Sequence, residues 1–182
     1  LDTGLFATKI TNIQQPEIFL RKQIYLDARL VTRDLLEHYD IVIYLAAISN
    51  DPMGEYFKNE TIEINYKSAV KIAKMSKKVG VEKFIFASSC SVYGDSATKI
   101  MDEESALNPL TTYAKTKAKT ELELEKLSTK NFLITSLRFA TACGASSRLR
   151  LDLVVNDFVA TSYKESKVTL MSRGNAYRPF IS

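Results

Sequence analysis

Three continuous apolar runs constrain the fold of this chain more than any other feature of its sequence. They cover residues 39–47, 83–88 and 131–138, and each is rich in β-branched or aromatic side chains. Such runs are typical of strands buried on both faces of a parallel sheet. A shorter strand is expected over residues 23–26.

Helical patterns lie between these runs. In residues 62–79 the apolar positions fall near one helical face, and Gly80 is expected to end this helix. A second helix is expected over residues 110–127, with Asn108-Pro109 as its start signal. Strands that alternate with helices indicate crossover connections and a parallel sheet covered on both sides. The predicted fold is therefore an α/β, doubly wound parallel sheet.

The character of the sequence changes after Gly144. A small and basic loop over residues 145–150 is followed by an expected helix, 152–163, and an expected strand, 167–171. This order is typical of the opening of a second, smaller α+β lobe. We predict one domain over residues 1–144 and the beginning of a second over residues 145–182.

Composition excludes several classes of protein. The 182 residues are 46% hydrophobic and 25% charged, as in an ordinary soluble globular domain. No apolar run approaches the ~20 residues of a membrane span, and no leader pattern is evident, so a cytoplasmic protein without membrane contact is expected. One histidine and two cysteines offer neither a zinc site nor a disulfide framework.

The net charge of +4 is dispersed along the chain. The densest basic stretch, residues 67–83, alternates with an apolar helical face. A solvated helix surface is therefore favoured over a nucleic-acid-binding patch.

Tyr113 and Lys117 are candidates for acid/base chemistry. Four residues apart on the second expected helix, they share one face. A free phenol, with a pKa of ~10, is a poor base at neutral pH, and a nearby ammonium favours the phenolate. Lowering this pKa by ~3 units needs about 4 kcal/mol. The pair would then take a proton from a substrate hydroxyl.

The spacing alone is weak, since Tyr163 and Lys167 repeat it. The context separates the two pairs. Tyr113 is preceded by a hydroxyl-rich turn, residues 88–94, at the carboxyl end of an expected strand. Ligands bind at that edge of open parallel sheets. Tyr163 and Lys167 lack such a partner, and we interpret them as a helix end.

Several short motifs follow one another in a specific order. They are Tyr44-Leu45-Ala46-Ala47, Ile64-Asn65, Ser88-Ser89 with Val92-Tyr93-Gly94, Tyr113-Ala114-Lys115-Thr116-Lys117, Leu137-Arg138 with Gly144, and Arg178-Pro179-Phe180-Ile181. Together they resemble the extended short-chain dehydrogenase/reductase family, in its NAD-dependent sugar-nucleotide epimerase/dehydratase branch. The resemblance covers nearly all of the chain. It implies a Rossmann-like fold, NAD as cofactor and a nucleotide-diphosphate sugar as substrate.

The resemblance also implies roles for the catalytic residues. Tyr113 would be the acid/base, Lys117 would lower its pKa and hold the nicotinamide ribose, and Ser89 would hydrogen-bond the reacting oxygen. Hydride would pass between a sugar carbon and the nicotinamide. Dehydratases of this branch carry an acidic residue or pair just after the catalytic hydroxyl, where this chain has Cys90-Ser91. Epimerisation or simple oxidation/reduction is therefore preferred over elimination, with Cys90 as a packing residue.

Other positions are matched to the cofactor. Asp2 would accept hydrogen bonds from the adenosine ribose and disfavour a 2′-phosphate, which favours NAD over NADP. Asp27 would contact the adenine beside Ala28, although a helix N-cap is an open alternative. The residues that the resemblance places at the cofactor, besides Tyr113 and Lys117, are Asp2, Asp27, Ala28, Leu45, Ala46, Ala47 and Asn65.

Substrate contacts are implied in the same way. Asn156 and Arg178 match positions that hold the diphosphate, and the planar fork of arginine suits phosphate oxygens. Arg150 either assists them or is solvated. Thr141 stands where many 4-epimerases carry asparagine, which leaves the sugar open. The residues placed at the substrate are Ser89, Ser91, Thr141, Asn156 and Arg178.

One departure from the family is large. None of the six glycines forms the glycine-rich turn that holds a pyrophosphate, and the second lobe is mostly missing. The chain is thus expected to be a fragment of a longer enzyme, incomplete at both ends, that dimerises through the helices over 62–79 and 110–127. A reductase or dehydratase of the same family, or a catalytically silent dinucleotide-binding module, is the alternative.

Overall fold

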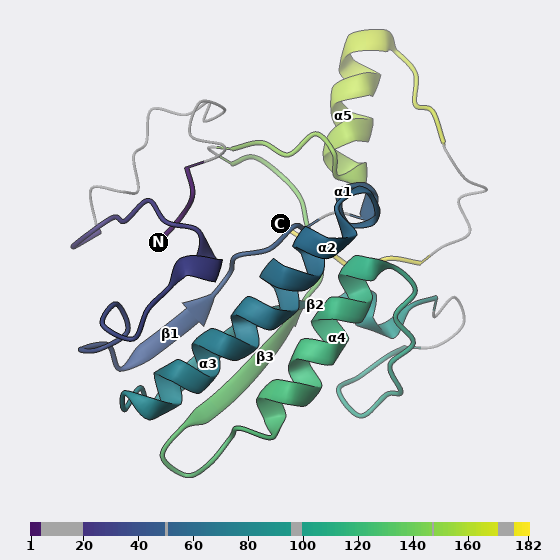
Figure 1. Ribbon diagram of the computed structural model, residues 1–182. Helices are drawn as coiled ribbons and strands as arrows, with labels where there is room; N and C mark the ends of the chain where they lie inside the picture. The colour runs from purple at the N-terminus through teal and green to yellow at the C-terminus, as the bar shows by residue number, and fades with distance from the viewer. Residues whose placement is uncertain (5–19, 50, 96–99, 147, 171–176) are drawn as a thin grey trace.

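The computed structural model of the protein describes residues 1–4, 20–49, 51–95, 100–146, 148–170 and 177–182. Its centre is a parallel sheet in the order β1-β2-β3 (Figure 1). The strands are β1 (Ile41–Tyr44), β2 (Lys83–Ser89) and β3 (Leu133–Phe139). The three apolar runs therefore form the predicted parallel strands.

The register leaves the end of β2 beyond the end of β1. Tyr44, the last residue of β1, pairs with Phe86, whereas β2 and β3 stay paired as far as Ser89 and Phe139. Ser89 consequently stands at the carboxyl edge of the sheet, one strand away from the loop that follows Tyr44.

Helices connect the strands as expected, with shifted ends. The segment predicted as one helix over 62–79 starts earlier, at Lys58, and contains a π-helical turn over Ile62–Ser68. The second helix begins at Thr112 and is capped by Thr111, whose hydroxyl accepts from the Ala114 N–H, so Asn108-Pro109 is not its start. The helices and turns are η3 (Ala28–Leu30), α1 (Asp51–Tyr56), α2 (Lys58–Thr61), η4 (Ile62–Ser68), α3 (Ala69–Lys78), η5 (Cys90–Tyr93), α4 (Thr112–Glu125) and α5 (Val154–Glu165).

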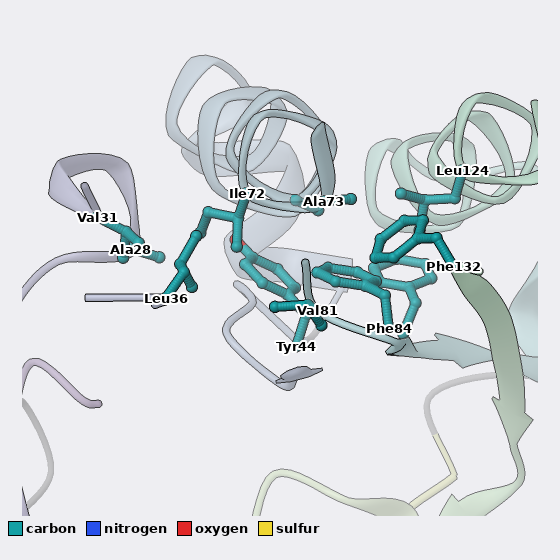
Figure 2. Packing of buried hydrophobic residues seen from close by; sticks show 12 residues of the cluster. Ala28, Val31, Leu36, Tyr44, Ile72, Ala73, Val81, Phe84, Leu124 and Phe132 are labelled. Atoms are coloured by element: carbon teal, nitrogen blue, oxygen red, sulfur yellow. The ribbon is translucent and has the colours of Figure 1, made fainter. Parts of the chain in front are cut away.

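Aromatic side chains fill the space between the sheet and helices α3 and α4 (Figure 2). The ring of Phe84 lies 6.4 Å from that of Tyr44 and 6.4 Å from that of Phe132. Leu124 of α4 and Ile72 of α3 close this layer from above. Each such side chain contributes roughly 1.5–3 kcal/mol by leaving water.

The opposite face of the sheet differs from the prediction. We expected helices on both faces, but within the described residues α3 and α4 cover one face. Alternate side chains of the strands stay in solvent on the other, among them Ile43, Leu133 and Phe139. Continuous apolar runs predict strands that are buried on both faces. Among the described residues, only one face of the sheet is covered.

Two short predicted strands are wrong or reduced. Residues 23–26 contribute a single parallel bridge, between Asp2 and Tyr25. Residues 167–170 form no strand and are exposed, because no described strand lies alongside to pair with them; Met171 lies outside the described residues. Instead, β4 (Thr141–Ala142) pairs in parallel with β5 (Phe180–Ile181).

Helix α5 confirms the interpretation of the second tyrosine–lysine pair. Tyr163 is 93% exposed in its last turn, and Ser166 ends the helix in a left-handed conformation. Within the part of the chain that the structure describes, none of the helices combines the length and apolarity required to cross a bilayer.

The aromatic layer makes a stability prediction. Replacing Phe132, which is 2% exposed, by alanine should lower the free energy of unfolding by about 3–5 kcal/mol, because it leaves a cavity beside Phe84 and Leu124. The matched change Lys126→Ala, at an exposed ion pair, should cost less than about 1 kcal/mol. Urea unfolding measures both, and equal costs would contradict the packing described.

Candidate active site

The turn after β2 brings two predicted residues together. Ser89 ends the strand, and its Oγ accepts hydrogen bonds from the backbone N–H of Ser91 at 3.2 Å and from the Ser91 hydroxyl at 3.0 Å. Because the Ser89 oxygen is the acceptor in both bonds, its own hydroxyl proton remains available for donation. The sequence therefore folds here into a short helical turn, η5, with Ser89 as its cap.

Gly94 fixes this turn against the chain that leads into α4. Its φ of +72° and its closeness to Asn108 both require glycine, since an added Cβ would overlap the Asn108 carbonyl. The N–H of Asn108 donates in turn to the carbonyl of Val92 at 3.0 Å. Residues 92–94 and the approach to α4 are thereby joined directly.

Helix α1 packs against the first turn of α4 from another direction. The Glu55 carboxylate accepts from the Thr112 N–H at 2.8 Å, which helps to hold the pKa of Glu55 at about 2. An added Cβ on Gly54 would lie 3.5 Å from the Cβ of Tyr113, so the two backbones are in close contact. Tyr113 is thus held between α1 and the turn after β2.

The phenol of Tyr113 is influenced by Ser89 and by charges on other segments. Burial raises the pKa of Tyr113, and hydrogen bonding with Ser89 offsets part of that rise. The charge of Asp51 also raises the pKa of this phenol, whereas the charge of Arg150 lowers it. Tyr113 is therefore a neutral phenol at neutral pH, surrounded by groups of both signs.

Lys117 lies beneath the phenol in the protein interior. It is 2% exposed, and its Nζ donates to the Ala87 carbonyl at 2.6 Å. The ammonium lies 4.8 Å from the ring centroid of Phe86 and 5.6 Å from that of Tyr113. Burial lowers the pKa of Lys117 to about 8, against the opposite effect of Glu121.

One expectation about this pair is not met. We expected Lys117 to depress the pKa of Tyr113, but in this structure desolvation of the phenol dominates and the net direction is upward. The ammonium lies over the face of the Tyr113 ring, and burial lowers its own pKa to about 8. The spacing of the two residues was informative about proximity and not about titration.

A partly buried ion pair that the sequence analysis missed supports the same region. Arg138 of β3 binds Glu121 of α4 at 2.8 Å and donates to the Tyr93 hydroxyl at 2.9 Å. These contacts raise the pKa of Arg138 and link β3, α4 and η5. The signal in the sequence was a charged residue inside an apolar strand, which needs a partner.

The residues predicted at the nicotinamide side have different surroundings. Asn65 is fully buried in the π-helical turn, and its amide exchanges two hydrogen bonds of 2.9 Å with the backbone of Ile48. Its side chain therefore positions the loop after β1. In that loop Leu45 and Ala46 are exposed and Ala47 is half-buried at the edge of the sheet.

The residues predicted at the adenosine lie by the bridge that joins residues 2 and 25. The Asp2 carboxylate accepts from the Gly4 N–H at 2.6 Å. Asp27 caps η3 and binds the guanidinium of Arg29, which lowers the pKa of Asp27; the N-cap alternative is therefore present. Ala28 is buried in the core.

Of the predicted substrate residues, Asn156 and Thr141 contact the protein backbone, whereas Arg178 is exposed. Asn156 is buried, and its amide holds the Gly144 N–H at 2.9 Å and the Arg150 carbonyl at 3.0 Å, so it organises the loop. Thr141 lies in β4 and pairs with Phe180. Arg178, by contrast, is exposed, and its charge reaches Cys90, whose thiol pKa is nevertheless raised by burial.

Arg150 joins the site from the loop before α5. Its Nη1 donates to the Ser49 hydroxyl at 3.1 Å, and its Nη2 pairs with Asp152 at 2.6 Å. The sequence analysis left two alternatives for Arg150, a solvated side chain or a contact with the substrate. Among the described residues no three His, Cys, Asp or Glu side chains gather as a metal site.

Comparison with known proteins shows the family to which the chain is similar. Residues 10–182 match the NAD dependent epimerase/dehydratase family. The chain is 28% identical over 184 residues to YtcB of Bacillus subtilis (strain 168), named as an uncharacterized UDP-glucose epimerase, with 96% of this chain and 56% of the relative covered.

Solved structures share the fold. TunA, an NAD-dependent NDP-hexosamine 5,6-dehydratase, superposes with a TM-score of 0.80 at 22% identity, covering 91% of this chain and 55% of its own. UDP-glucuronic acid 4-epimerase from Bacillus cereus, solved with UDP-glucuronic acid and NAD, superposes with a TM-score of 0.74 at 25% identity, covering 86% and 50%. The chain spans about half the length of the proteins it matches.

The contact at Gly94 predicts a local effect on the site. Gly94→Ala should force the turn away from Asn108, cost about 1–3 kcal/mol of stability and lower kcat at least ~10²-fold, because Ser89 would be misplaced. Gly80→Ala is the matched control. Its φ is also positive, at +89°, but an added Cβ would meet nothing within 4 Å, so only about 1–2 kcal/mol and no activity should be lost. Equal losses of activity would contradict this account.

Burial of Lys117 predicts a pH dependence of stability. Its pKa is about 8 in the folded protein and 10.5 ordinarily, so the unfolded chain binds more protons between those values. The burial penalty is fully present below pH ~8 and is relieved as the pH rises towards ~10.5. Relative to Lys117→Met, the wild type should therefore gain stability between pH ~7 and ~10. Urea unfolding at both values tests this, and a pH-independent difference would refute it.

Proposed function

The chain belongs to the NAD-dependent epimerase/dehydratase family, and from this premise we propose that the protein is an NAD-dependent nucleotide-sugar epimerase working through a keto-sugar intermediate. The observation that carries the proposal is the effect of Ser89, at the carboxyl edge of the sheet, on the Tyr113 phenol, whose pKa it lowers against the effect of burial. A proton carrier and a second hydroxyl are thus directed at one point, where a substrate oxygen can lie.

Proton transfer falls to Tyr113. The phenol moves a proton to and from the sugar hydroxyl, while Ser89 donates a hydrogen bond to the reacting oxygen. Because burial raises the pKa of Tyr113, the phenol is protonated at neutral pH and can serve as the acid that gives a proton to the keto oxygen when hydride returns to the sugar carbon. The charge of Arg150 lowers the pKa of Tyr113 and so favours the phenolate needed in the opposite direction.

The chemistry of the cofactor side fits the residues that are present. Lys117 makes a hydrogen bond to Ala87, and an ammonium has three donors, so further donors suit the hydroxyls of a ribose. The apolar, partly exposed residues Leu45, Ala46 and Ala47 after β1 allow close approach of a flat ring. When bound there, NAD would accept a hydride from the sugar carbon and give it back.

The substrate class follows from charge and from an absence of acid in η5. Arg178 and Arg150 bring two guanidinium groups near the phenol and Cys90, which suits a diphosphate. Cys90 and Ser91 supply no carboxylate beside Ser89, which supports epimerisation or simple reduction over elimination of water. We also propose a homodimer through α3 and α4, which lie side by side on the sheet (Figure 1).

Substitution of the phenol tests the proposal. In the full-length protein, Tyr113→Phe should reduce turnover about 10²–10⁴-fold because the proton carrier is removed, while NAD binding is retained. The matched control is Tyr163→Phe, at the other tyrosine with a lysine four residues later, which should be fully active. Products from NAD and a panel of UDP- and dTDP-sugars are measured by chromatography.

Two outcomes would count against the function. Undiminished turnover by Tyr113→Phe would eliminate the proposed proton carrier. Absence of any epimer or keto-sugar from the whole panel would instead leave a catalytically silent dinucleotide-binding module.

A further inference from the structure

Asp51 presents a buried oxygen without a partner. It is the first residue of α1 and follows the loop after β1. Its Oδ1 atom is shielded from solvent and has no hydrogen-bond partner in the described part of the chain. A carboxylate oxygen removed from water and left without a donor is costly, so such an atom indicates a donor that arrives with a ligand.

The position of Asp51 on α1 directs it towards the site. Gly54 and Glu55, three and four residues later, contact Tyr113 and Thr112 of α4. Residues at these spacings share one face of a helix. Asp51 therefore lies on the face of α1 that packs against the start of α4.

The charge of Asp51 acts on the phenol itself. It raises the pKa of Tyr113, together with burial and against the effects of Ser89 and Arg150. The groups that face this phenol are Ser89 from β2, Cys90 from η5, Asp51 from α1, Arg150 from the loop before α5, and Lys117 from its own helix. Asp51 thus adds a carboxylate to a site whose turn after β2 has none.

We propose that Asp51 is a substrate-binding residue whose carboxylate accepts a hydrogen bond from a hydroxyl of the sugar ring. The inference rests on the proposed function and adds a recognition element to it. Sugar hydroxyls are donors that match an ionised carboxylate, and such charge-assisted bonds are stronger than neutral ones. The nucleoside diphosphate keeps its ribose but lacks the hexose whose hydroxyl Asp51 would bind, so its affinity should be independent of Asp51.

Equilibrium binding separates the sugar from the nucleotide. The full-length Tyr113→Phe protein, loaded with NAD and slowed in turnover, is titrated calorimetrically with UDP-glucose and with UDP. Adding Asp51→Asn should weaken UDP-glucose binding about 10-fold and Asp51→Ala about 10- to 100-fold, with UDP affinity changed less than ~2-fold. Asp34→Asn, at an exposed carboxylate, is the control and should alter neither affinity.

The outcomes distinguish the two proposals. Unchanged UDP-glucose affinity in the Asp51 variants, or equal loss of UDP-glucose and UDP, overturns the role of Asp51 and leaves the proposed function standing. Failure of the parent protein to bind either probe overturns the proposed function, and the role of Asp51 with it.

A pH profile provides a readout that a purely structural residue would not move. Removing the negative charge favours the phenolate, so in Asp51→Asn the rise of kcat/KM with pH should have its midpoint at lower pH than in the wild type. The Asp34→Asn control should keep the wild-type midpoint. An unmoved midpoint, or one displaced to higher pH, overturns the proposal.

Discussion

Attachment of α4 to β2 through the buried ammonium of Lys117 is the constraint on which the candidate site depends. The bond of 2.6 Å to the Ala87 carbonyl and the ring faces of Phe86 and Tyr113 surround a charge that is removed from water. Ala87 precedes Ser89 by two residues and Lys117 follows Tyr113 by one helical turn. A single contact therefore sets the offset that brings the phenol to the serine.

Buried polar groups hold the loops around this contact. Asn65 fastens the loop after β1, Asn156 fastens the loop before α5, and Arg138 with Glu121 ties the sheet to α4. Both asparagines were expected to touch ligands. In the structure each amide binds backbone groups, as a buried amide usually does because an unpaired one is costly.

Local patterns in the sequence were sufficient for the order of strands and helices. Burial of a whole strand or helix produces a regular pattern of apolar residues. This pattern is present in β1, β2 and β3 and in α3 and α4. Ends of elements were less accessible. Thr111 and not Asn108-Pro109 begins α4, because the cap is chosen by the hydrogen bond that the tertiary path allows. The exposure of one face of the sheet could not be predicted either, because most of its side chains are apolar like those of the buried face.

The sequence by itself determined the parallel order of the strands, the shared helical face of Tyr113 and Lys117, and the hydroxyl-rich turn at the edge of the sheet, since each depends on residues close in the chain. Tertiary structure alone decided the electrostatics. The raised pKa of Tyr113, the lowered pKa of Lys117 and the approach of Asp51 and Arg150 come from desolvation and from charges on separate segments. Both effects depend on distances in space, and spacing along the chain carries no record of them.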